Sequence, residues 1–95
     1  MNLEKLREYR SSIIALAQQY HAHNIRVFGS IIKDENDENS DIDFLIVPTP
    51  EQDLFDIIRL RRSLKELLNC DVDIVHETAL HHTIKEAILS SAIPL

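Results

Sequence analysis

Two aspartates, Asp41 and Asp43, stand two residues apart at the start of the apolar run IDFLIV, residues 42–47. A short run of branched apolar side chains that ends at Pro48 predicts a buried strand. Side chains two residues apart on a strand leave the same face, with Cα atoms about 6.6 Å apart. Two carboxylates about 5 Å apart repel by roughly 3 kcal/mol at an effective dielectric of 20. The pair therefore favours a divalent cation, and Mg²⁺ prefers such oxygen ligands.

The preceding apolar run, IRVF at 25–28, ends at Gly29 and Ser30, and Gly29 is the only glycine of the chain. A residue without Cβ lets the backbone approach a ligand, and a following helical turn would offer free N–H groups to an anion. A third carboxylate, Asp73, is available in the run VDIV at 72–75. Phosphate at Gly29 and Ser30, facing metal ions at the carboxylates, is the arrangement of two-metal phosphoryl or nucleotidyl transfer.

The acidic segment between Ser30 and Asp41 has simpler explanations than a binding site. Residues 34–39 have the composition of a solvated turn, and we expect such a loop there. A calcium loop of the EF-hand kind needs glycine at its position 6 and glutamate at its position 12. Neither the register that begins at Asp34 nor the one that begins at Asp37 supplies them, so this reading is excluded.

The elements that must position these residues follow from apolar spacing. Apolar side chains three and four residues apart predict amphipathic helices over 3–20, over 52–68 and from Glu77 onward. Strands are predicted at 25–28, 42–47 and 72–75, and AIPL at 92–95 closes the chain near a turn set by Pro94. This order predicts an α/β (α+β) fold, with helices packed on a small mixed β-sheet.

Composition limits the class of protein. Ninety-five residues form a single domain, residues 1–95, with one compact core. The net charge of −6 argues against broad binding to nucleic acid. No apolar run could cross a bilayer and no signal-peptide pattern is present, so we expect a cytoplasmic protein without membrane contact. The single cysteine, Cys70, fits a reducing compartment and is expected to be a packed thiol.

Further candidates are weaker. Asp71 could assist Asp73, and His76 could reach the same site from the end of the third strand. A zinc site is rejected, because no Cys/His set has the required spacing. The basic group at Arg59, Arg61, Arg62 and Lys65 is most simply the polar side of a helix, and its alternative role is a docking face for an acidic partner.

Gly29-Ser30, ten residues and then Asp41-Ile42-Asp43 resemble the signature of the DNA polymerase β-like nucleotidyltransferase superfamily. The chain is similar to the minimal nucleotidyltransferases (MNT proteins) over nearly its whole length: a leading helix, VFGS, SDIDFLI, a long helix, VDIV and a short helix before AIPL. The resemblance implies the polymerase β-like nucleotidyltransferase fold.

The resemblance also implies an activity. Asp41, Asp43 and Asp73 would bind two Mg²⁺ ions and form the catalytic site. The chain would be the antitoxin of a toxin with a HEPN domain, an all-helical RNase, and would silence it by transferring AMP from ATP to a tyrosine hydroxyl. With no room for a separate acceptor-binding domain, the acceptor is expected to be a docked protein.

The phosphate-binding segment departs from the family pattern. Gly29 and Ser30 would hold the phosphates of ATP, but the family commonly continues GSxARG, whereas Ile31, Ile32 and Lys33 follow here. Lys33 keeps one positive charge without the two-pronged contact that an arginine makes to phosphate.

Two other functions remain open. An antitoxin could neutralise its toxin by binding alone, with the acidic site kept for structure or nucleotide sensing. A nucleotidyltransferase acting on small molecules would need an additional domain, which this chain lacks.

Overall fold

The computed structural model describes residues 1–32 and 41–95. Its helices are α1 (Leu3–Glu8), α2 (Arg10–Gln19), α3 (Leu54–Leu68) and α4 (His82–Ser91). Its strands are β1 (Ala22–Phe28), β2 (Ile42–Pro48), β3 (Val72–His76) and β4 (Ile93–Pro94), with 3-10 turns η1 (Gly29–Ile31) and η2 (Glu77–Ala79). Lys33 and the expected solvated loop at 34–39 lie outside the described residues.

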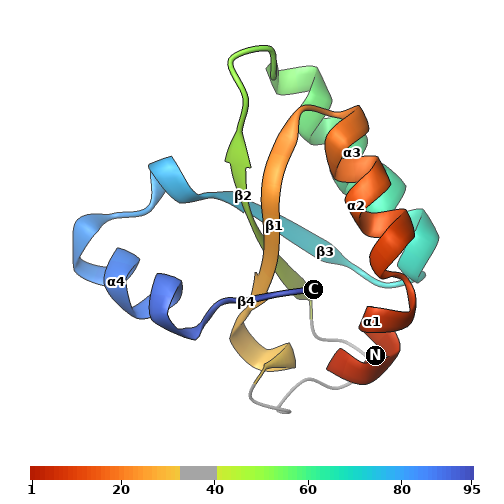
Figure 1. Cartoon of the computed structure of the whole chain (residues 1–95), viewed down its shortest axis with the longest axis horizontal. Helices are drawn as coiled ribbons and strands as arrows, with labels where there is room; N and C mark the ends of the chain where they lie inside the picture. The colour runs from red at the N-terminus through yellow and green to blue at the C-terminus, as the bar shows by residue number, and fades with distance from the viewer. Residues whose placement is uncertain (33–40) are drawn as a thin grey trace.

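The four strands form one sheet in the order β3-β2-β1-β4. Strand β1 pairs antiparallel with β2 and β4, whereas β2 pairs parallel with β3. Helices α2 and α3 lie side by side along one side of the strands, and α4 lies away from them on the other side (Figure 1). The mixed sheet and packed helices expected from the sequence are confirmed.

The core forms between α2, α3 and the sheet because alternate residues of β2 face the helices. Ile42, Phe44 and Ile46 are at most 1% exposed and join Leu60 and Leu64 of α3 in one apolar cluster. Leu45 is also fully buried, although it lies outside that cluster on the other face of the strand. Because β2 is buried on both faces, its apolar side chains follow one another in a nearly continuous run. Asp43 alternates with the core residues, so it points to the face opposite α2 and α3.

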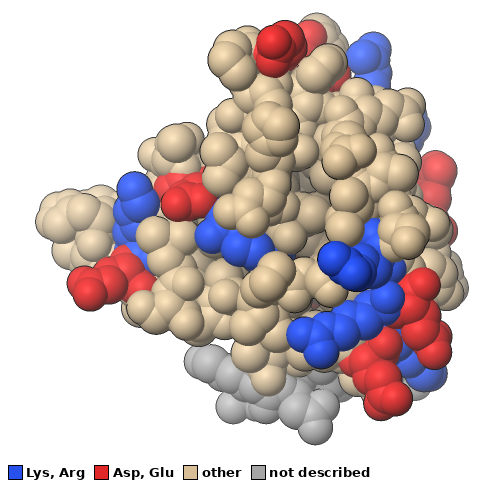
Figure 2. Space-filling view, in the orientation of Figure 1, with Lys and Arg blue, Asp and Glu red and all other residues tan. Residues whose placement is uncertain are grey.

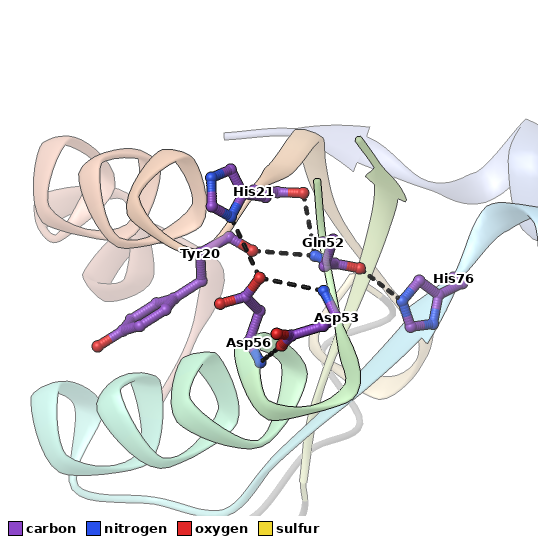
Figure 3. A network of polar contacts seen from close by, with 6 residues as sticks. All are labelled: Tyr20, His21, Gln52, Asp53, Asp56 and His76. Atoms are coloured by element: carbon purple, nitrogen blue, oxygen red, sulfur yellow. Dashed lines mark hydrogen bonds and ion pairs between the residues drawn. The ribbon is translucent and has the colours of Figure 1, made fainter. Parts of the chain in front are cut away.

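A polar network fixes the start of α3 against the sheet (Figure 3). Asp53 and Asp56 form a reciprocal capping box, in which the Asp56 amide donates to Asp53 Oδ1 over 2.8 Å. The Asp53 amide and His21 Nδ1 each donate to Asp56 Oδ2 over 3.1 Å. These two hydrogen bonds, that of Asp53 first, lower the pKa of the Asp56 carboxyl below its ordinary value. Gln52 Nε2 donates to the carbonyls of Tyr20 and His21, which ties α3 to the start of β1.

The ends of several elements differ from the sequence-based expectation. The predicted helix 3–20 is two helices, because the Tyr9 amide donates to Leu6 three residues back and Tyr9 leaves the helical region. Strand β1 begins three residues early, because a bulge between His23 and Arg26 accommodates Asn24 at φ 49°. The helix expected from Glu77 onward begins only at His82, because Glu77 starts the 3-10 turn η2 instead. The turn expected near Pro94 is part of the short strand β4.

The surface carries charges of both signs. In Figure 2, acidic and basic side chains lie intermixed over α1 and the lower part of α2, and much of the surface over the strands carries neither. That side of the molecule therefore does not present a field of one sign. Within residues 1–32 and 41–95, none of the helices combines the length and the apolar character needed to cross a bilayer.

Candidate active site

Strand register brings the predicted acidic residues together. Asp43 of β2 pairs with Asp73 of β3 on one side and with Phe28, the last residue of β1, on the other. Paired residues of neighbouring strands project from the same face of a sheet, about 4.8 Å apart. Asp41 lies just before β2, two residues from Asp43, and is exposed. The three carboxylates therefore lie near one another at one end of the sheet, with Asp43 and Asp73 on the face opposite α2 and α3.

Gly29 lies directly against this group. Its φ is +80°, a conformation that disfavours residues with a side chain. A Cβ built on Gly29 would lie 2.5 Å from Asp43 Oδ2, closer than real Cβ contacts allow. The glycine thus gives the Asp43 carboxylate its space. Ser30 follows in the 3-10 turn η1, which closes with the Ile32 amide donating to the Gly29 carbonyl over 3.1 Å.

The environment of Asp43 disfavours its negative charge. The side chain is half-buried, and this burial is the main cause that raises the pKa of the Asp43 carboxyl. The nearby carboxylates of Asp73 and then Asp41 raise that pKa further. A cation placed among the three would remove the repulsion and favour the ionised form.

The donor atoms suit a hard divalent ion, although they are not yet gathered around a single point. Asp73 Oδ1 accepts a hydrogen bond from the Ile74 amide of its own strand over 3.1 Å. Among residues 1–32 and 41–95, no three His, Cys, Asp or Glu side chains are arranged to hold a metal ion. Carboxylate oxygens are nevertheless the ligands of Mg²⁺, which keeps several waters and needs only one or two carboxylates from the protein. A rotation of the exposed Asp73 side chain would free it for such an ion.

The weaker sequence candidates lie elsewhere. Asp71 Oδ1 forms an ion pair with Lys65 Nζ over 3.0 Å. His76 lies three residues beyond Asp73, roughly 10 Å along the strand, and its Nε2 donates to Gln52 Oε1 over 2.9 Å. Burial raises the pKa of the half-buried Cys70 thiol, which keeps it protonated at neutral pH. Lys33 is outside the described residues.

One feature beside the site was not predicted from the sequence. A groove of about 520 Å³ lies between α3 and β3, and Asp73 lines it together with Ile58, Arg61 and Arg62. The spacing of the basic residues on the predicted helix gave a signal for this surface. Its position next to Asp73 depends on how the helix packs against the strand, which the spacing does not encode.

Comparison with known proteins assigns the family. Residues 11–95 match the family model described as polymerase beta, nucleotidyltransferase. A protein of Methanocaldococcus jannaschii named as a candidate protein adenylyltransferase is 31% identical over 88 residues, which cover 93% of this chain and 95% of the relative. The protein adenylyltransferase MntA of Thermococcus cleftensis is 31% identical over 78 residues, 82% of this chain and 79% of that protein.

Solved structures agree. The structure of a candidate minimal nucleotidyltransferase superposes with a TM-score of 0.90 at 40% identity, over 100% of this chain and 97% of that one. An MNT antitoxin in complex with the tri-AMPylated HEPN toxin of Shewanella oneidensis shares the fold, with a TM-score of 0.68 at 20% identity over 93% of this chain and 69% of that one. The resemblance drawn from the sequence is confirmed: the chain belongs to the polymerase beta nucleotidyltransferase family and has the fold of the minimal nucleotidyltransferases.

Proposed function

We propose that this chain is a Mg²⁺-dependent protein adenylyltransferase that acts as an antitoxin. It transfers AMP from ATP to a tyrosine hydroxyl of a HEPN-domain RNase toxin and so neutralises that toxin in the cytoplasm. The observation that carries the proposal is the contact between Gly29 and Asp43, with Asp73 paired beside them. The names of the relatives, protein adenylyltransferase among them, support the choice of AMP as the transferred group.

The roles of the residues follow from their positions. Asp41, Asp43 and Asp73 would hold two Mg²⁺ ions, and such ions would neutralise the charge that develops on the transferred phosphoryl group. Gly29 and Ser30 hold the phosphates of ATP, because the turn η1 begins there and exposes backbone next to Asp43. We assign Lys33 to the same phosphates.

The reaction is a substitution at phosphorus. The tyrosine oxygen forms a bond to the α-phosphorus of ATP while the bond from that phosphorus to the bridging β-phosphate oxygen breaks. Pyrophosphate leaves with the electron pair of the broken bond, and the hydroxyl proton passes to water. The chain contributes chiefly by orientation and by the electrostatic field of its carboxylates and their ions, as is general for phosphoryl transfer.

A second candidate is an antitoxin that neutralises by binding alone. Two observations favour it: Asp73 Oδ1 is engaged with its own strand, and the segment after Ser30 lacks the arginine and glycine common in the family. Under this alternative the acidic site would serve structure or nucleotide sensing.

One experiment separates the two candidates. The purified chain is incubated with the HEPN-domain toxin that the proposal names as its partner, ATP labelled at the α-phosphate and Mg²⁺. We expect label on the partner, its loss with Asp41→Asn, and unchanged labelling with Glu86→Gln, an exposed residue of α4 that carries the same charge. The absence of label with the wild-type chain, together with toxin neutralisation that survives Asp41→Asn, would establish binding alone.

A further inference from the structure

Helix α3 exposes large apolar side chains on its outer side. Leu54 is 72% exposed, Phe55 63% and Ile58 55%. Residues three and four positions apart on a helix are close neighbours, so Ile58 lies beside both Phe55 and Leu54, and the three form one apolar patch. A contiguous exposed apolar patch rimmed by polar residues is one mark of an interaction surface.

The same side of α3 carries four basic side chains and one exposed acidic one, Glu66. Arg59, Arg61, Arg62 and Lys65 are four of the ten Lys and Arg residues of a chain with net charge −6. The guanidinium carbon of Arg59 lies 5.9 Å from the centre of the Phe55 ring, which presents cation and aromatic ring together. Lys65 pairs with Asp71, but both side chains are 60% exposed, so this pair leaves the cation available at little cost. Arginine and aromatic residues are those that most often dominate binding energy at protein interfaces.

The patch continues into the groove beside the active site. Ile57, Ile58 and three of the cations line the groove from α3, and Asp73 and Ile74 line it from β3. Strand β3 is an edge strand of the described sheet and pairs with β2 alone (Figure 1). A protein segment lying in the groove would contact Asp73 at the edge of the sheet, and Asp73 pairs with Asp43 of the neighbouring strand.

The exposed edge of β3 is already engaged by side chains. Arg61 Nε donates to the Val72 carbonyl over 3.1 Å, and Asp73 Oδ1 accepts from the Ile74 amide over 3.1 Å. Both backbone groups are on the side of β3 away from β2, where an added strand would have to pair. The groove therefore suits a helix that contacts side chains better than it suits an additional strand.

We propose that the α3 face, defined by Leu54, Phe55, Ile58, Arg59, Arg61, Arg62 and Lys65, is the docking surface for the acceptor protein, and that the docked segment is an amphipathic helix with acidic and apolar side chains. This inference rests on the proposed function, because it names how the acceptor reaches the site. Charge complementarity selects the partner, since four cations require acidic groups opposite them. A second copy of the chain would place the same cations against each other across a two-fold axis. Nucleic acid is disfavoured, because large apolar residues interrupt the cations and the chain as a whole is acidic.

A pair of matched variants tests the proposal. Ile58→Glu/Arg62→Glu changes one apolar and one basic residue on the α3 face, and Ile84→Glu/Lys85→Glu makes the same changes on α4, where Ile84 is 50% exposed. The affinity of each full-length variant for the purified HEPN-domain protein is measured by calorimetry without ATP, after circular dichroism has verified its fold. We expect the α3 variant to bind at least about 30-fold more weakly, as hot-spot substitutions do, and the α4 variant to bind within about threefold of wild type.

The readouts distinguish this proposal from that of the activity. Asp41→Asn should retain wild-type affinity while losing transfer, and the α3 variant should raise the KM for the partner without changing the KM for ATP. If wild type binds but transfers no label, and the α3 variant loses binding, the docking surface stands and the proposed activity fails. Unchanged affinity of the α3 variant, an equal loss with the α4 variant, or no binding of wild type would overturn the docking proposal. The docking proposal would also be overturned if the main effect of the α3 variant were a loss of self-association. A loss of binding to a labelled RNA as its main effect would overturn it in the same way.

Discussion

Replacing Asp43 by asparagine should stabilise the metal-free protein. Asp43 pairs directly with Asp73, and burial together with two neighbouring carboxylates raises the pKa of Asp43. At about 5 Å, two carboxylates repel by roughly 3 kcal/mol at an effective dielectric of 20 and by about 0.8 kcal/mol in bulk water. Since Asp73 is exposed and Asp43 only half-buried, screening favours the lower end, about 1 kcal/mol. For a domain of this size that gain raises Tm by about 4–8 °C.

The pH dependence of this effect has a definite sign. The folded-state pKa of Asp43 is raised, so the folded protein binds the Asp43 proton more tightly than the unfolded chain does. Stability therefore falls as pH rises from the unfolded value, about 3.9, through the folded value. The advantage of Asp43→Asn should be present at neutral pH and should vanish below about pH 4.

The assay is thermal unfolding with and without Mg²⁺ at low ionic strength. With a Kd of about 1 mM, about 10 mM Mg²⁺ would stabilise the wild type by roughly 1.4 kcal/mol, whereas Asp43→Asn should respond much less. Glu86→Gln controls for the change in net charge, because Glu86 is exposed on α4. If Asp43→Asn lowers Tm in chelator, or if Mg²⁺ stabilises it as much as wild type, then carboxylate repulsion does not govern this site.

Three further predictions concern the residues that position the site. Gly29→Ala should destabilise the protein by about 1–3 kcal/mol in urea unfolding, since φ is +80° and the new Cβ displaces the Asp43 carboxylate. Transfer of AMP should fall as well, and unchanged stability would contradict the contact between Gly29 and Asp43. Asp56→Asn should destabilise the protein at neutral pH. Because the pKa of Asp56 is lowered in the folded protein, the difference in unfolding free energy from wild type should shrink as pH falls through that pKa; a difference that stays constant with pH would refute this prediction. Glu77→Gln should cost about 1–3 kcal/mol, because it removes the charged partner of the 12% exposed Arg26 guanidinium, which would keep its hydrogen bond to the Asn24 carbonyl. The double variant Arg26→Met/Glu77→Gln should recover part of the loss.

The sequence predicted the elements whose signal is local. Branched apolar runs predict β2 and β3, and apolar spacing predicts α3 to its last residue, because burial imposes these patterns on each element separately. The break at Tyr9 has no such signal, since neither glycine nor proline occurs there. The bulge near Asn24, where φ is positive, has no local signal either, because it arises from the pairing of β1 with β2, which comes later in the chain.

The sequence singles out the residues of the candidate site but does not show how they lie relative to one another. Asp41 and Asp43 could be recognised as a pair because two-residue spacing on a strand fixes their common face. That Asp43 faces Asp73 is a matter of register between strands separated by a helix, and no local pattern encodes it. The same holds for the α3 groove, which exists only because the helix packs beside an edge strand.

The position of Gly29 sharpens what the ten-residue spacing means. The pairing of Phe28 with Asp43 places the end of β1 beside the start of β2, so the chain must leave and return at nearly the same point. Gly29 was expected to let the backbone approach a ligand, but its immediate neighbour is the Asp43 carboxylate. The requirement for glycine therefore arises within the acidic site itself, and it is met here although the residues after Ser30 depart from the family pattern.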